Sequence, residues 1–100
     1  PEQIQIVQDY NKKYLKCVRD YSNETAGYEH TAGSVIYVDH FSISEKEDKP
    51  GEYDIYPLVY MNGNVQIFEM DLKDLQENFE VITEVKEFKK ARKMFPFVKE

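Results

Sequence analysis

The fold is decided by residues 53–70, which read YDIYPLVYMNGNVQIFEM. Their first half, Tyr53–Met61, is rich in β-branched and aromatic side chains, which favour strands. Asn62-Gly63 follows, a dipeptide typical of the two-residue turn between antiparallel strands. Because residues 64–70 again alternate, the stretch predicts a β-hairpin. Pro57 lacks a backbone N–H donor, so we expect an open edge or a bulge there.

The hairpin register follows from the length of the turn. A two-residue turn places Tyr60 opposite Val65 and Leu58 opposite Ile67 on one face. Ile55, Pro57 and Val59 then lie on the other face, so both faces are apolar.

Two further segments precede the hairpin. Residues 35–43 form a strand, which strict alternation would orient with Val35, Tyr37, Phe41 and Ile43 on one face. Apolar residues recur at helical spacing from Glu2 to Tyr21, which predicts one long amphipathic helix. Residues 22–34 break that period and are expected to form a loop.

The C-terminal part is expected to be helical. Asp71 suits the N-cap of a helix that begins at Leu72. Residues 79–83 suit either a strand or a continued helix, and residues 84–95 again have helical spacing and end before Pro96. The prediction is therefore a single α+β domain over residues 1–100. Its order is α-β-β-β-α: a three-stranded antiparallel meander packed with an N-terminal helix and one or two C-terminal helical segments.

A sheet with two apolar faces needs cover on both. Either the helical regions lie on opposite faces, or they share one face and another molecule buries the second. The second arrangement makes a homodimer or a partner protein a serious candidate.

Composition narrows the class of protein. The chain is 41% hydrophobic and 32% charged, so it is neither a disordered tail nor a transmembrane segment. One cysteine cannot form an internal disulfide and no signal peptide is recognised, so a cytoplasmic location is expected, in the host cytoplasm if the gene is phage-encoded.

The net charge of −6 is unevenly distributed along the chain. Residues 1–38 carry five acids and four bases, a net charge of −1. Residues 39–84 carry twelve acids and three bases, a net charge of −9, whereas residues 85–100 carry two acids and six bases, a net charge of +4. The sequence therefore predicts an acidic region over the strands and a basic last helix.

The acidic region favours a non-enzymatic module that binds a basic protein, because complementary charge selects partners and speeds association. A small inhibitor or regulator, of the kind that phages and mobile elements encode, fits this composition, and nucleic-acid mimicry is its extreme form. The solvated-surface interpretation of the same charges stays open. The expected partner-binding residues are Glu45, Glu47, Asp48, Glu52 and Asp54, with Tyr53 and Tyr56 beside them.

The basic helix supports an alternative, binding of RNA or DNA. Lys86, Lys89, Lys90 and Lys93 recur at helical spacing and line one face. The element order and the string Lys89-Lys90-Ala91-Arg92-Lys93 resemble the double-stranded-RNA-binding domain, whose last helix carries a Lys-Lys-x-Ala-Lys cluster. That family places the cluster at the start of the helix, whereas here it lies near the end and follows Glu84 and Glu87.

No pattern of catalytic or metal-ligating residues is found. The imidazoles are His30 and His40, and Cys17 is the single thiol, so no metal site and no cofactor are expected. Adjacent strand residues point to opposite faces, so Asp39 and His40 are not expected to contact each other. Cys17 is expected to be a buried, inert thiol.

Overall fold

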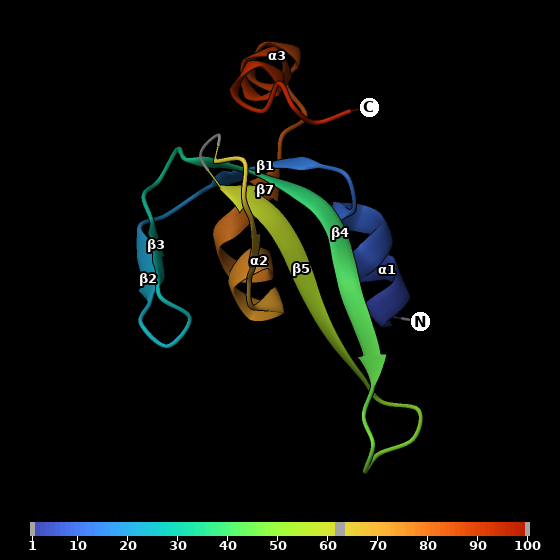
Figure 1. Ribbon diagram of the computed structural model, residues 1–100. Coiled ribbons are helices and arrows are strands. Elements are labelled where there is room, and N and C mark those ends of the chain that lie inside the picture. The colour runs from blue at the N-terminus through green and yellow to red at the C-terminus, as the bar shows by residue number, and fades with distance from the viewer. Residues whose placement is uncertain (1, 62–63, 100) are drawn as a thin grey trace.

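The computed structural model describes residues 2–61 and 64–99 and shows an α+β fold (Figure 1). Its elements are α1 (Glu2–Tyr10), β1 (Tyr14–Cys17), β2 (Tyr21–Asn23), β3 (Tyr28–His30), β4 (Val35–Glu45), β5 (Tyr53–Met61), β6 (Ile67–Glu69), α2 (Leu72–Asn78), β7 (Phe79–Val81) and α3 (Val85–Met94).

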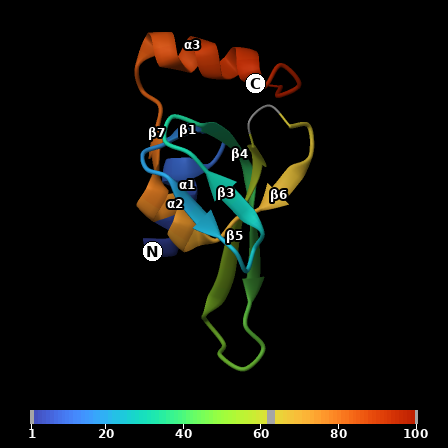
Figure 2. The ribbon, with the colours of Figure 1, turned by 90° about the vertical axis from the view of Figure 1, so that its left-hand side faces the viewer.

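Five strands form one antiparallel sheet in the order β6-β5-β4-β1-β7, and β2 and β3 pair separately. The β4–β5 hairpin continues well beyond its neighbours and projects from the body, while α3 lies across the opposite end (Figure 2). The described part of the molecule is accordingly elongated, with extents of 44 × 30 × 22 Å.

The long N-terminal helix predicted from the sequence is wrong in its second half. Helix α1 ends at Tyr10, and Lys12 adopts a left-handed conformation with φ 59°. The Lys12 N–H then donates to the Val38 carbonyl at 2.9 Å, which turns the chain into the sheet. Residues 14–17 continue as β1, paired with β4 on one side and β7 on the other.

Burial on both sides of β1 explains the error. Leu15 and Cys17 face one side of the sheet and Tyr14 faces the other, and all three are buried. A strand with both faces buried loses the polar alternation that identifies a strand. Without that alternation, the recurrence of Tyr10, Tyr14, Val18 and Tyr21 every three or four residues was interpreted as a helix.

The loop predicted over residues 22–34 is also partly wrong, because it contains most of a second hairpin. Tyr21 pairs with His30 and Asn23 with Tyr28, and the Gly27 N–H closes the turn by donating to the Asn23 carbonyl at 2.8 Å. Gly27 has φ 82°, a conformation that glycine adopts without a steric penalty.

The register between β5 and β6 differs from the prediction by two residues. Tyr60 lies opposite Ile67 instead of Val65, and Leu58 lies opposite Glu69. The predicted Asn62-Gly63 turn lies outside the described residues. A shift of two residues preserves the alternation, so these residues keep the faces that were predicted for them.

A β-bulge at Asp39 overturns the predicted faces of β4. Val38 pairs with Val59 and His40 pairs with Leu58, which leaves Asp39 without an opposite residue. The extra residue reverses the alternation that follows it. Phe41 and Ile43 therefore share the face of Val38, not the face of Tyr37 as strict alternation had predicted.

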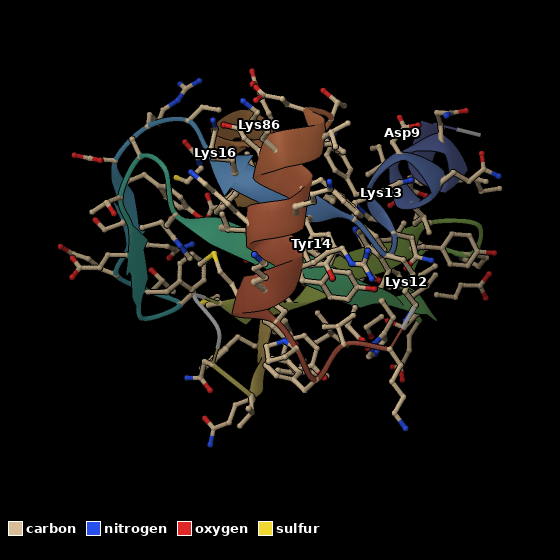
Figure 3. All side chains as sticks on the ribbon, turned by 90° about the horizontal axis from the view of Figure 1, so that it is seen from above. Asp9, Lys12, Lys13, Tyr14, Lys16 and Lys86 are labelled. Carbon is tan, nitrogen blue, oxygen red and sulfur yellow. The ribbon has the colours of Figure 1, made fainter. Side chains whose placement is uncertain are left out.

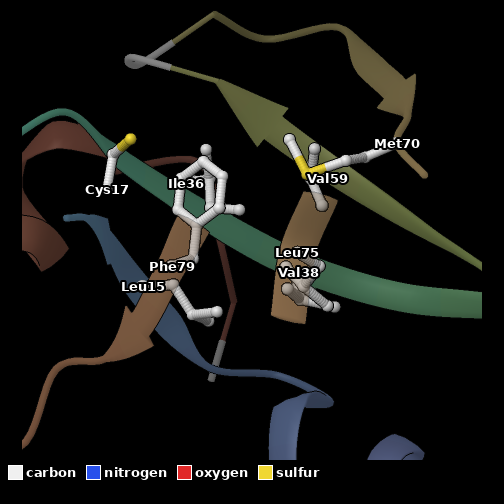
Figure 4. Close-up of a cluster of buried hydrophobic side chains, with 8 residues drawn as sticks. All are labelled: Leu15, Cys17, Ile36, Val38, Val59, Met70, Leu75 and Phe79. Carbon is white, nitrogen blue, oxygen red and sulfur yellow. The ribbon is translucent and has the colours of Figure 1, made fainter. Parts of the chain in front are cut away.

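The two faces of the sheet carry two separate cores, and the helices lie on opposite faces. One core joins α2 and the β2–β3 hairpin to the sheet, and its centre is shown in Figure 4. It consists of Leu15, Cys17, Ile36, Val38, Val59, Met70, Leu75 and Phe79. The other core packs α3 on the opposite face, with Tyr14, Val35, Tyr37, Ile82, Ala91 and Phe95. Helices therefore cover both faces, as the first arrangement required, but α1 shares the face of α2 and α3 alone covers the other.

The C-terminal elements agree closely with expectation. Asp71 is the N-cap residue of α2, and α3 covers residues 85–94. Of the segment left open at residues 79–83, Phe79–Val81 forms β7, an edge strand beside β1, and residues 82–83 lie outside it. Strand β6 pairs only with Leu58–Tyr60, so Pro57 lies where the pairing on that side of β5 ends.

Candidate functional site

The expected partner-binding residues gather on one feature, the tip of the β4–β5 hairpin. We call residues 45–54 the acidic arm; it carries five carboxylates and two lysines, a net charge of −3. Glu45 ends β4, and Tyr53 and Asp54 begin β5. Four of the five carboxylate residues are exposed, and Asp54 is half-buried. The acidic arm therefore presents a concentrated negative charge at the far end of the molecule from α3 (Figure 1).

One lysine partly neutralises the acidic arm. The Lys46 ammonium lies 3.8 Å from a carboxylate oxygen of Glu52 and 3.8 Å from one of Asp54. Both pairs are solvent-exposed, and such pairs contribute only about 0–1 kcal/mol to stability. A cationic partner can therefore compete with Lys46 for these carboxylates at little energetic cost.

The two tyrosines of the predicted site do not act on one surface. Tyr53 and Tyr56 are three residues apart on β5, so they point to opposite faces of the hairpin. Tyr53 lies opposite Glu45 on the face that α1 approaches, whereas Tyr56 lies opposite Ser42 on the other face. Tyr53 therefore shares a face with Glu45, whereas Tyr56 shares the opposite face with Asp54.

The remaining carboxylates of residues 39–84 do not extend the acidic arm. Asp71 and Asp74 belong to α2, where both accept hydrogen bonds from the Asn23 side-chain amide, at 2.7 and 2.9 Å. Asp39 lies beside Lys12 at 3.7 Å. These three groups are used in internal contacts. The other four carboxylates of the region are exposed but lie outside the acidic arm: Glu69, Glu77, Glu80 and Glu84.

The alternative nucleic-acid residues also lie as expected, on the outer side of α3. Lys86, Lys89, Lys90 and Lys93 are all exposed. The buried side of the helix holds Ala91, and Phe95, which follows the helix, is also buried.

Basic residues from other elements surround this helix, seen from above in Figure 3. A cavity of about 600 Å³ on one side is lined in part by Lys12, Lys13 and Lys99. Another of about 580 Å³ is lined in part by Lys89, Arg92 and Lys93. Lys16 is paired with Glu87 at 2.6 Å, and this hydrogen bond raises the pKa of the lysine. The basic end is thus broader than the four predicted lysines, although Lys16 is paired.

Asp39 and His40 contact each other, contrary to the prediction from alternation. The Nδ1 atom of His40 lies 2.7 Å from a carboxylate oxygen of Asp39. The bulge at Asp39 is the reason, because it breaks the alternation that would have separated the two side chains. Half of the His40 side chain is exposed, so the contact is a hydrogen bond at the surface.

The second histidine is buried in an aromatic cluster. The His30 ring stacks on Tyr21, with centroids 5.5 Å apart, and meets the edge of Phe79 at 5.3 Å. Neither ring nitrogen has a hydrogen-bond partner among the described residues. Burial lowers the pKa of His30, and the Asp74 carboxylate only partly opposes this effect. Nearby, the Tyr28 hydroxyl donates to Asp74 at 2.7 Å, and burial raises the pKa values of Tyr21 and Tyr28.

This environment predicts that stability falls in mild acid. The unfolded chain protonates its histidine near pH 6.5, whereas folded His30 resists protonation until a lower pH. Between these two values the unfolded state binds more protons, so the free energy of unfolding decreases as pH falls. His30→Phe should remove this pH-dependent loss of stability. It also removes two unpartnered polar atoms, which should raise the free energy of unfolding by about 1 kcal/mol at either pH.

Urea unfolding at pH 7.5 and pH 5.0 tests this expectation. The difference in free energy of unfolding between His30→Phe and the original chain should be larger at pH 5.0 than at pH 7.5, with the variant the more stable. A His40→Gln variant keeps His30 and should therefore keep the acid sensitivity. An equal gap at both pH values would show that His30 is not protected from protons.

Sequence reasoning missed one surface feature, an apolar groove between α1 and the hairpin. The groove has a volume of about 620 Å³ and includes Ile4, Ile43 and Ile55. The helical periodicity had placed Ile4 in the core stripe, and strict alternation had placed Ile43 on the other face. The groove could have been predicted only from the bulge at Asp39, and the sequence carries no recognisable sign of that bulge.

Other kinds of site are not found in the described part of the chain. No group of three or more His, Cys, Asp or Glu side chains in residues 2–61 and 64–99 is placed to hold a metal ion. None of the helices there has the length and apolar character needed to cross a lipid bilayer. Cys17 is buried, and its thiol donates to the Arg19 carbonyl at 2.9 Å.

Comparison with known protein families, curated proteins and solved structures finds no match for this chain.

Proposed function

We propose that this protein is a non-enzymatic binding module that uses its acidic arm to bind a basic surface of another protein. The observation that carries the proposal is the position of the charge. Five carboxylates sit on a hairpin that projects from the body, where a partner can reach them from several sides. Complementary charge of this kind accelerates association and disfavours partners of the wrong sign.

The size and charge suit a small inhibitor or regulator acting in the cytoplasm. If the target is a protein that binds nucleic acid, the carboxylates of the acidic arm would occupy its phosphate-binding surface, and the arm would act as a nucleic-acid mimic. A phage or mobile-element origin fits the same picture. Binding should weaken steeply with salt, because exposed charges more than about 8 Å apart are screened at physiological ionic strength.

The experiment is a capture from lysate of the native host with three versions of the protein. Glu47→Lys, Asp48→Lys and Glu52→Lys together reverse the acidic arm and should abolish capture of the partner. Glu24→Lys, Glu29→Lys and Glu77→Lys make the same change of net charge at exposed positions elsewhere and should leave capture intact. Capture that survives reversal of the acidic arm would refute the proposal.

Binding of RNA or DNA is the second candidate, and one observation favours it. Lysines from two other parts of the chain, Lys12 with Lys13 and Lys99, lie at the same end of the molecule as those of α3. Phosphate binding depends on such clusters and is strongest at low salt. A gel shift with mixed RNA and DNA at low salt should show a complex that Lys89→Glu with Lys93→Glu removes. Absence of any shift would eliminate this candidate.

A further inference from the structure

The groove between α1 and the β4–β5 hairpin is an unusual surface for a chain of this charge. Its floor includes Val7, which is half-buried, and Ile55, which is buried. Its walls are more exposed: Ile4 is 63% exposed, Ile43 is 54% exposed and Tyr53 is 41% exposed. Large apolar side chains that are exposed singly need no explanation, whereas a cluster of them marks a binding surface.

The groove has an uncharged lining, and the net charge of the hairpin tip beside it is negative although Lys46 pairs there with Glu52 and Asp54. Glu45 lies directly opposite Tyr53, and Glu52 precedes Tyr53 in the chain. No lysine or arginine lines the groove among the described residues, and the α1 side contributes the uncharged Gln3 and Gln8. The apolar wall therefore borders directly on the acidic arm.

This arrangement disfavours a second copy of the chain as the occupant. A two-fold symmetric pair would bring two arms of net charge −3 together around one apolar contact. Like charges across an interface oppose association. A cationic occupant would instead gain from the same carboxylates.

We infer that the groove binds the apolar side of a basic amphipathic peptide segment, with lysines or arginines that reach the acidic arm. This inference rests on the proposed function and specifies the partner: a segment in which one or two large apolar side chains are flanked by positive charge. The volume of about 620 Å³ lies in the range of clefts that bury an anchoring group. The apolar anchors would provide most of the affinity, and the charges would provide rate and selectivity.

The test uses a fluorescein-labelled 14-residue peptide of leucine and lysine with helical spacing, and measures fluorescence anisotropy at low and physiological salt. A peptide with every leucine replaced by serine keeps the charge and should bind at least ten-fold more weakly. Binding of both peptides with equal strength would mean that charge alone is recognised, and the groove would have no role.

Variants then separate the groove from the acidic arm. Ile4→Gln with Ile43→Gln should lower the affinity for the leucine-lysine peptide at least ten-fold. Val65→Gln with Val85→Gln changes two similarly exposed apolar residues, 71% and 66% exposed, outside the groove and should have no effect. Since all four side chains are exposed, thermal unfolding should confirm that each variant is folded.

The outcomes distinguish this inference from the proposed function. One outcome is that reversal of the acidic arm abolishes peptide binding while the variant with Ile4→Gln and Ile43→Gln still binds. This result would refute binding in the groove and would leave the proposed function unaffected. Unchanged binding on reversal of the arm would overturn both. Light scattering that shows a dimer disrupted by the groove substitutions would assign the groove to self-association. No binding at millimolar peptide would overturn the inference.

Discussion

Replacement of Leu15 by alanine is expected to lower the free energy of unfolding by about 3 kcal/mol. Leu15 is fully buried at the centre of β1, where it packs in the core shared with α2. Removal of a buried leucine side chain costs the transfer free energy of its methyl and methylene groups and leaves a cavity, for a total of about 2–5 kcal/mol. A domain of this size has a total stability of only about 5–15 kcal/mol, so the loss should be conspicuous.

Val18→Ala is the matched control, measured in the same urea titration. Val18 lies on the apolar stripe of the long helix that periodicity suggested, yet it is 37% exposed and lies just beyond β1. Its replacement should cost well under 1 kcal/mol. The long-helix interpretation predicts the opposite order for the two variants. A larger effect at Val18 than at Leu15 would therefore contradict the strand.

Replacement of Phe95 by alanine is expected to cost about 3–5 kcal/mol, as is usual for a buried phenylalanine. Phe95 follows the last residue of α3, is 1% exposed and lies 6.0 Å from the Tyr14 ring. It also meets the edge of Phe97, at 6.1 Å between ring centroids. Phe95 therefore connects the C-terminal segment with β1, and its loss should release α3 from the sheet.

Near-ultraviolet circular dichroism and urea unfolding check this expectation. The tyrosine signal should weaken, because Tyr14 loses an aromatic neighbour. Met94→Ala, at the adjacent position that is 39% exposed, should cost less than 1 kcal/mol. If Phe95→Ala also costs less than 1 kcal/mol, α3 does not contribute to the stability of the sheet.

Much of the fold could be predicted from local signals. Strand β5 was predicted with its observed bounds, because β-branched and aromatic residues are dense and turn signals lie on both sides. Helix α3 was predicted to within a residue at each end, since its apolar spacing is regular and Pro96 follows. Asp71 was recognised as an N-cap because its residue type and position suffice.

The failures share one physical cause, the influence of distant parts of the chain. Tyr14, Leu15 and Cys17 form a strand only because β4 and β7 provide backbone partners, and β7 lies more than 60 residues away. Leu15 is apolar but did not fit the helical spacing of Tyr10, Tyr14 and Val18, and this was the available sign that residues 14–17 bury two faces. The bulge at Asp39 has no local signature, so the contact with His40 could not be anticipated.

The charge of the candidate site could be predicted from the sequence, but the shape of the surface beside it could not. Glu47, Asp48 and Glu52 lie between two recognised strands, so their exposure at a hairpin tip followed from the sequence. The apolar groove depends on where α1 ends and on the bulge that rotates Ile43 toward it. Both features arise from tertiary contacts.

The position of β1 in the chain also delays the completion of the sheet during translation. Residues 14–17 leave the ribosome early, but their second hydrogen-bonding edge has no partner until residues 79–81 follow. At about 5–20 residues per second, the 61 intervening residues take roughly 3–12 s to be made. During that interval the nascent chain exposes an unpaired apolar strand, the kind of segment that chaperones shield and that associates with neighbouring chains. Overproduction in a cell should therefore yield more folded protein when translation is slow and chaperones are abundant.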